Sequence, residues 1–283
     1  MAYHWIPIQA PSAGVRITQK KPFAASPVKA GGSIFTVAGS SEVRVLEPNA
    51  VAPTAGRMGK GGERLYISGH PAGGVVEQWN LSTPYDLSTA TYITAIGGSG
   101  TYMSEMSIAA NGEYIYMWNV VTRVLYRRSL TVPWELSATA AVDNITAPES
   151  NGYSMCVASD GSKMIVTFLA KTMYVYTMST PWDIAGATRV SVSQNVFGLS
   201  AFALGGLCFS PDGTHIYVLA TNDIYSYVLD TPFDITGVVT PLDTYDMSGL
   251  SGQLEDIDVW PEENHWYATR YVGLDSVIEL KLR

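Results

Sequence analysis

Two cysteines, four histidines, an acidic stretch and a basic cluster are the residues of this sequence that could carry chemistry. Neither Cys156 nor Cys208 has a histidine or a cation in its local sequence that would lower the pKa of a thiol. The histidines are His4, His70, His215 and His265. They show no His-x-x-x-His or Glu-x-x-His spacing of the kind that gathers metal ligands. We therefore expect no catalytic residue, no metal ligand and no cofactor-binding residue in this chain.

Acidic residues gather in the stretch Glu255-Asp-Ile-Asp258, which is followed by Glu262 and Glu263. A solvated strand and turn is the expected role of this stretch. The alternative is an acidic lining for a channel that holds Ca²⁺, an ion that requires six to eight oxygen ligands.

The basic cluster consists of Arg123, Arg127 and Arg128. Charged side chains guard exposed strand edges against unwanted pairing, so an exposed edge is the expected location. An anionic partner surface is the alternative.

A repeat of about fifty residues organises the chain. Its first marker is a short motif whose copies start at Gly62, Gly112, Gly161, Gly213 and Glu263. The motif reads Gly-Glu-Arg-Leu-Tyr-Ile in the first copy and Gly-Thr-His-Ile-Tyr-Val in the fourth. A shortened sixth copy is also expected, with Gly31-Gly-Ser-Ile-Phe-Thr36 followed by Glu42-Val-Arg-Val-Leu46.

A second marker follows the first by about twenty residues in four copies: Ser82-Thr-Pro-Tyr-Asp-Leu87, Thr131-Val-Pro-Trp-Glu-Leu136, Ser179-Thr-Pro-Trp-Asp-Ile184 and Asp230-Thr-Pro-Phe-Asp-Ile235. Threonine as an N-cap, proline at the first helical position and an acid three residues after the cap predict one helical turn here. Val132 replaces the threonine in one copy, so that turn should be less well capped.

Each repeat has room for four short strands. Turns such as Ser210-Pro-Asp-Gly213 reverse the chain, and the runs 215–220 and 224–228 predict a hairpin. A later apolar run, such as 90–96, supplies a fourth strand. Small sheets of this size must stack in a ring to bury both faces, which predicts an all-β fold, a single β-propeller. Six blades are expected, with five or seven as alternatives.

The last copy ends with its third strand, over 276–282, so its sheet lacks a fourth. We expect an N-terminal strand, with residues 15–18 as the candidate, to pair there and close the ring. The predicted organisation is thus an N-terminal arm with the closing strand over 1–26 and a propeller over 27–283. Residues 1–10 could instead form a free arm that docks on a partner.

The repeat also assigns roles to particular side chains. Cys156 and Cys208 occupy equivalent positions in adjacent copies, and neighbouring sheets lie too far apart for a disulfide, which predicts two free, buried thiols. The repeated aromatics are Tyr85, Trp134, Trp182 and Phe233, and the acids after them are Asp86, Glu135, Asp183 and Asp234. Groove filling and turn capping are the expected roles of these two sets, and a ring of sugar contacts is the alternative.

Composition excludes several function classes. The chain has 283 residues, a formal net charge of −8 and only 15% charged residues, so a nucleic-acid partner is not expected. Its 47% hydrophobic residues exclude a disordered chain, and no apolar run is long enough to span a membrane. The first ten residues do not form a signal peptide, which predicts synthesis in a cytoplasm.

The Ser-Pro-Asp-Gly type turn, the hairpin and the Ser-Thr-Pro-Trp-Asp-Ile marker together resemble propeller repeats of tail and other virion proteins of bacteriophages. More distantly, they are similar to WD-repeat and lactonase-like propellers, although the usual Gly-His and Trp-Asp dipeptides of WD repeats are not in place. The resemblance covers roughly residues 30–283.

This resemblance implies a non-enzymatic structural virion protein, located in a tail, a fibre or the particle surface, that acts as a rigid protein–protein interaction module. Other virion proteins are the implied partners, and copies of the chain could form a symmetric homo-oligomer in the particle. A receptor-binding module for host glycans is one alternative, and a hydrolase with an axial metal is another. The loop 70–74, which belongs to one blade only, and the N-terminal arm are the preferred contact regions.

Overall fold

The structure, a computed structural model, describes residues 43–46, 52–70, 74–97, 103–119, 122–146, 152–168, 172–198, 204–220, 223–247, 253–260, 265–271 and 276–281. These residues form strands and short 3-10 helices, with no α-helix among them. Within these ranges, no helix has the length and apolar character needed to cross a membrane.

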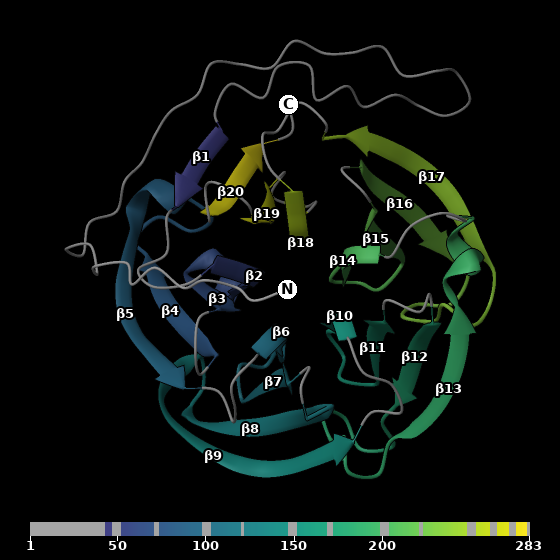
Figure 1. Ribbon diagram of the computed structural model, residues 1–283, viewed down its shortest axis with the longest axis horizontal. Coiled ribbons are helices and arrows are strands. Elements are labelled where there is room, and N and C mark those ends of the chain that lie inside the picture. The colour runs from purple at the N-terminus through teal and green to yellow at the C-terminus, as the bar shows by residue number, and fades with distance from the viewer. Residues whose placement is uncertain are drawn as a thin grey trace, which may run out of the picture.

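The described strands form five antiparallel four-stranded sheets, arranged as blades around a central axis (Figure 1). Blade 1 contains β2 (Ala52–Gly59), β3 (Arg64–His70), β4 (Val75–Leu81) and β5 (Ala90–Gly97). Blade 2 contains β6 (Met103–Ile108), β7 (Tyr114–Asn119), β8 (Val124–Val132) and β9 (Glu135–Thr146). Blade 3 contains β10 (Gly152–Val157), β11 (Lys163–Phe168), β12 (Thr172–Thr177) and β13 (Thr188–Ser193). Blade 4 contains β14 (Leu204–Phe209), β15 (His215–Ala220), β16 (Asp223–Leu229) and β17 (Val239–Asp246).

Blade 5 is assembled from both ends of the described chain. It contains β18 (Gln253–Trp260), β19 (His265–Tyr271) and β20 (Ser276–Lys281), and its outer strand is β1 (Val43–Leu46). The pairs Val45 with Ile278 and Leu46 with Val277 set the antiparallel register of β1 on β20. An N-terminal strand therefore closes the ring, as the missing fourth strand predicted.

The closing strand also decides the blade count. Residues 43–46, the end of the expected shortened copy, supply β1 to the last blade, so the described ring has five blades, the alternative to the expected six. The inner strands β2, β6, β10, β14 and β18 each contact the next one, and β18 contacts β2. Residues 15–18, the first candidate for closure, and the arm 1–26 lie outside the described residues.

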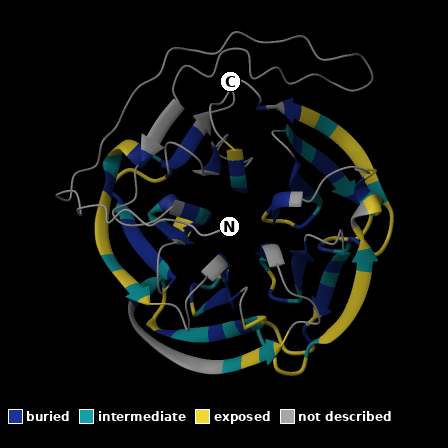
Figure 2. Cartoon of the chain, viewed as in Figure 1, coloured by how far each residue is buried: buried dark blue, intermediate teal, exposed yellow. Residues whose placement is uncertain are grey.

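The hydrophobic core lies between the blades. Middle strands such as β7, β11 and β15 are buried along nearly their whole length, because both faces of each sheet pack against a neighbour. The outer strand β13 is mostly exposed (Figure 2). Few exposed strand positions therefore remain for charged residues, in keeping with the low charged fraction of the chain.

The two markers of the repeat contact each other within each blade. Gly112 has a φ of 72°, and the Trp134 ring lies so close that a Cβ on this glycine would sit 2.2 Å from it. The backbone N–H of Trp134 donates to the carbonyl of Gly112 at 2.8 Å. Gly62, Gly161 and Gly213 meet Tyr85, Trp182 and Phe233 in the same way. The sequence therefore repeats a glycine and an aromatic because they form one contact.

The helical turn predicted at the second marker forms in blade 1 only, as the 3-10 helix η2 (Leu87–Thr89). Its N-cap is Asp86, whose side chain accepts from the N–H of Ser88, and the predicted threonine cap is wrong. Thr83 instead starts a β-turn, closed by a hydrogen bond from the N–H of Asp86 to its carbonyl at 3.2 Å. Tyr85, the third residue, has a φ of 63°, as a type II turn requires. In blade 2, which has Val132, β8 runs through this two-residue turn directly into β9.

Candidate functional site

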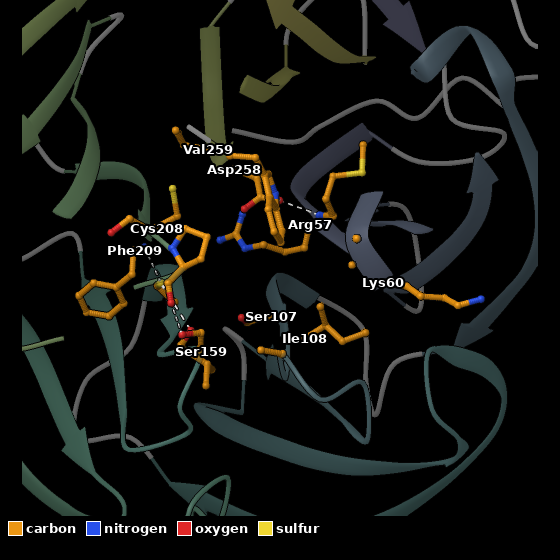
Figure 3. A pocket seen from close by; sticks show the side chains of 18 of the residues that line it. Arg57, Lys60, Ser107, Ile108, Ser159, Cys208, Phe209, Asp258 and Val259 are labelled. Carbon is orange, nitrogen blue, oxygen red and sulfur yellow. Dashed lines mark hydrogen bonds between the residues drawn. The ribbon is translucent and has the colours of Figure 1, made fainter. Parts of the chain in front are cut away.

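Each of the five blades contributes one residue, from the same position of the repeat, to a site at the axis. The five residues lie near the C-terminal ends of the inner strands. They lie five residues before the start of the first marker and are Arg57, Ser107, Cys156, Cys208 and Asp258. All five line a cavity of about 320 Å³ (Figure 3).

The walls of this axial cavity are mainly apolar. The next residue of every inner strand contributes to them: Met58, Ile108, Val157, Phe209 and Val259. Lys60, Trp134, Pro211 and Trp260 also line it, and Lys60 and Pro211 are exposed. The cavity thus has a polar floor, apolar walls and a partly exposed rim.

Arg57 spans the centre of the ring. Its Nη1 donates to the carbonyls of Gly56 and Ile257 at 2.9 and 3.0 Å and pairs with Asp256. Its Nη2 donates to the carbonyl of Met155 in blade 3 at 2.9 Å and to Asp256 Oδ1 at 3.2 Å. One buried guanidinium therefore joins blades 1, 3 and 5.

Two carboxylates of β18 bond to the backbone of β2. Asp256 Oδ2 accepts from the N–H of Gly56 at 3.3 Å, and Asp258 Oδ2 accepts from the N–H of Met58 at 2.7 Å. Within its described sheet, the inner strand β2 has no neighbouring strand on the side that faces the axis. These two bonds give its N–H groups an acceptor there. Acidic side chains thereby fasten the last blade to the first.

Three buried carboxyl groups share one arginine. Burial raises the pKa of Asp256 to about 6, although Arg57 opposes the shift, and burial also raises the pKa of Asp258. The pKa of Glu105 in blade 2 is raised well above its usual value by burial and by the charge of Asp256. Glu105 Oε2 has no hydrogen-bond partner among the described residues. Burial therefore favours the protonated form of Glu105 most strongly, whereas Asp256 pairs with Arg57.

The cysteines are free and buried, as predicted. Cys156 Sγ accepts from the N–H of Phe209 at 3.3 Å, so this thiol has a structural contact with the next blade. Burial raises the pKa of Cys156 to about 12 and that of Cys208 well above its usual value. Because the thiolate is the reactive form, both side chains are chemically quiet at neutral pH.

The prediction that the acidic stretch is a solvated strand and turn is wrong for its aspartates. Asp256 and Asp258 are buried on the inner strand β18, since Arg57 and backbone donors compensate their burial. No group of three potential metal-ligating side chains occurs in the part of the chain that the structure describes. Glu262 and Glu263 lie outside that part.

The basic cluster does not guard an exposed edge as a unit. Arg123 is exposed, but Arg127 is buried in the middle of blade 2. Arg127 bonds to Asp143 through Nε and Nη2 at 2.9 and 2.7 Å, and its Nη1 donates to the carbonyl of Trp182 in blade 3 at 2.6 Å. Asp183 lies 3.2 Å from Nη2. Sequence proximity placed Arg127 with a surface cluster, whereas its partners come from elsewhere in the fold.

Three of the four repeated acids cap turns, as expected, and three of the four pair with the preceding blade. Asp86, Asp183 and Asp234 each accept a backbone N–H two residues ahead. The pairs between blades are Arg64 with Glu135 at 2.8 Å, Arg127 with Asp183 at 3.2 Å and Lys163 with Asp234 at 2.7 Å. Burial opposes ionisation of Asp234, yet the hydrogen bonds from Lys163 and Thr236 lower its pKa. The repeated aromatics are buried or half-buried, as groove filling predicted.

The remaining candidates are the histidines, the loop 70–74 and the N-terminal arm. Thr214 Oγ1 lies 2.8 Å from Nδ1 of His215. His70 and His265 belong to strands whose backbone alone is described at these positions. His4, the N-terminal arm and most of the loop 70–74 lie outside the described residues.

Sequence reasoning did not identify Arg57 and Ser107 as candidate site residues. Comparing the residues five positions before each marker would have grouped them with both cysteines and Asp258. The two cysteines show their equivalence by residue type, whereas Arg57, Ser107 and Asp258 share only their distance from the marker.

Comparisons with known proteins do not assign this chain to a family. The sequence matches no protein-family model and no curated protein. Among solved structures, the β-propeller domain of Cps50 (Swd1) from Myceliophteria thermophila is similar, with a TM-score of 0.48 and 8% sequence identity. The match covers 84% of this chain and 98% of that domain. The fold is a β-propeller on the evidence of the described residues themselves, whose five sheets form a closed ring.

Proposed function

We propose that this chain is a non-enzymatic structural protein of a bacteriophage particle, where it works as a rigid protein–protein interaction module in a tail, a fibre or the particle surface. The observation that carries the proposal is the closure of the ring: β1 completes blade 5, and Arg57 and Asp256 join the first and last blades at the axis. Fastening both ends of the propeller suits a part that transmits force and keeps its shape in an assembly.

The chemistry of the axis supports a binding role in preference to catalysis. Arg57 and Asp258, which line the cavity, are occupied by internal hydrogen bonds, and so is Asp256 beside them. A high thiol pKa keeps Cys156 protonated, so it lacks the activation that a nucleophile needs. The particle assignment comes from the resemblance of the repeat to phage virion proteins, and the partners would be other virion proteins.

The proposal is tested on particles. Density-banded phage particles would be prepared from the bacterium that carries the gene and analysed by quantitative mass spectrometry and by electron microscopy with labelled antibody. We expect the protein in a fixed ratio to the major capsid protein and labelling at one location. Recovery only from bacterial envelopes would overturn the proposal.

A parallel assay addresses catalysis and host receptors. We expect the purified chain to hydrolyse no lactone with or without Ca²⁺ and to bind no member of a glycan array. The repeated aromatics needed for a ring of sugar contacts are engaged with turn glycines. Specific glycan binding would replace the structural role with a receptor-binding one.

A further inference from the structure

The axial cavity contains a polar group that the fold does not use. Ser107 is only 4% exposed and lines the cavity. Its hydroxyl has no hydrogen-bond partner among the described residues, in contrast to the nearby Asp258 carboxylate. Figure 3 shows Ser107 facing the hollow at the centre of the view. Because buried hydroxyls nearly always find a partner, this one is available to a ligand.

The size of the cavity limits what can enter. An apolar cavity of about 150 Å³ is enough to bind benzene. At about 320 Å³, the axial cavity has roughly twice that volume, which suits a group as large as two fused aromatic rings.

The residues that line the cavity disfavour the binding of a charged group. Met58, Ile108, Val157, Phe209 and Val259 provide apolar walls on every side. The floor contains one guanidinium and one carboxylate, Arg57 and Asp258, so it offers no net charge to a ligand. A charged group would lose its hydration here without gaining a free counter-charge.

We propose that the axial cavity binds an uncharged, mainly apolar ring group of up to two fused rings, oriented by a hydrogen bond between its polar atom and Ser107 Oγ. Such a group could belong to a free small molecule or to an aromatic side chain at the tip of a partner's loop. The inference does not rest on the particle assignment, because it follows from the cavity alone.

The test compares two probes of equal ring size, 2-naphthol and naphthalene, by quenching of tryptophan fluorescence and by calorimetry. We expect one site per chain and about threefold to tenfold tighter binding of 2-naphthol, the usual worth of one hydrogen bond. Ser107→Ala should abolish that preference while leaving naphthalene binding unchanged. If Ser107→Ala still binds 2-naphthol more tightly than naphthalene by the same factor as the wild type, the role of the hydroxyl is overturned.

A filling variant tests the location. Val157→Phe places a ring in the cavity and should weaken both probes at least tenfold. The matched control is Val190→Phe on the exposed strand β13, which should bind like the wild type. If Val157→Phe does not fold, Ile108→Phe fills the cavity from β6 instead. Unchanged binding in a folded filling variant, or no binding of either probe by the wild type, would overturn the proposal.

A third measurement separates the two sources of the ring. A short disulfide-closed hairpin peptide with a tyrosine at its tip is titrated against the complex with 2-naphthol, and the same peptide with serine at its tip is the control. Displacement by the tyrosine peptide alone assigns the cavity to a partner's loop. Retention of 2-naphthol assigns it to a free small molecule.

Discussion

Arg57 and Asp256 lie 199 residues apart in the sequence and form a buried ion pair at the axis of the propeller. The arginine comes from the first blade and the aspartate from the last. The ring is therefore closed in two places. The ion pair closes it at the axis, and the β1–β20 pairing closes it on the outer side of blade 5.

Removing either partner of this pair should strongly destabilise the ring. Arg57→Met leaves buried carboxylates without their cation, and Asp256→Asn leaves the guanidinium without its counter-charge. Each should cost about 3 to 5 kcal/mol in the free energy of unfolding, measured by denaturant titration. Lys60→Met removes one partner of an exposed pair with Glu63 and should cost less than about 1 kcal/mol. A similar cost for the buried and exposed variants would contradict the role of the axial pair.

The raised carboxyl pKa values set the direction of the pH dependence. Glu105 keeps its proton in the folded state at pH values where the unfolded chain has lost it, so its contribution to stability falls as pH rises above the unfolded pKa. The slope is at most about 1.4 kcal/mol per pH unit for one group. Glu105→Gln imitates the protonated form, and the variant should lose this part of the slope and be more stable than the wild type at pH 8. Denaturant midpoints at pH 5 to 8 check this, and parallel curves for both proteins would exclude the shift.

Tyrosine hydroxyls should contribute measurably to the blade interfaces. Tyr66, Tyr116 and Tyr267 donate to the carbonyls of Trp134, Trp182 and Tyr85 in the next blade, at 2.8, 2.7 and 2.6 Å. Replacing one of them by phenylalanine leaves a carbonyl without this donor, at a cost of about 1 to 3 kcal/mol. Tyr92→Phe, on the outer strand β5, should be nearly neutral. Equal unfolding free energies for Tyr267→Phe and Tyr92→Phe would show that the hydroxyl bond contributes nothing.

A glycine series separates backbone strain from steric conflict. Gly97 has open space and no positive φ, Gly61 has open space with a φ of 62°, and Gly112 has a φ of 72° and the Trp134 ring against it. Alanine should be nearly neutral at Gly97, should cost about 1 kcal/mol at Gly61, and should cost more than about 2 kcal/mol at Gly112. Thermal unfolding of the three variants gives this order, and a tolerant Gly112→Ala would contradict the contact between the two markers.

The buried thiols should resist modification in the folded protein. Burial keeps Cys156 and Cys208 protonated, so a disulfide reagent at pH 8 should label neither of them within the time that fully labels the unfolded chain. Counting released chromophore with and without denaturant measures this. Cys156→Ser, which keeps an acceptor for the N–H of Phe209, should be more stable than Cys156→Ala. Rapid labelling of the native protein would show that the axis opens.

Local features of the fold could be predicted from the sequence because each blade uses the same short-range contacts. Turn glycines, hairpins and the aromatic after proline recur in every copy that has both markers, so their spacing predicted a propeller and placed strands such as 215–220 correctly. The turn acids were also predicted, since they bond to residues two positions away.

What only the tertiary structure decided depends on residues far apart in the chain. The assignment of 43–46 to the last blade, and hence five blades instead of six, follows from pairing with β20, which leaves no periodic signal. The burial of Asp256, Asp258 and Arg127 is compensated by partners on other blades, so their sequence neighbourhood suggested exposure. The repeat determined the structure of each blade, because the contacts within a blade are local. Closure of the ring determined the axial site, because its five residues become neighbours only when the first and last blades meet.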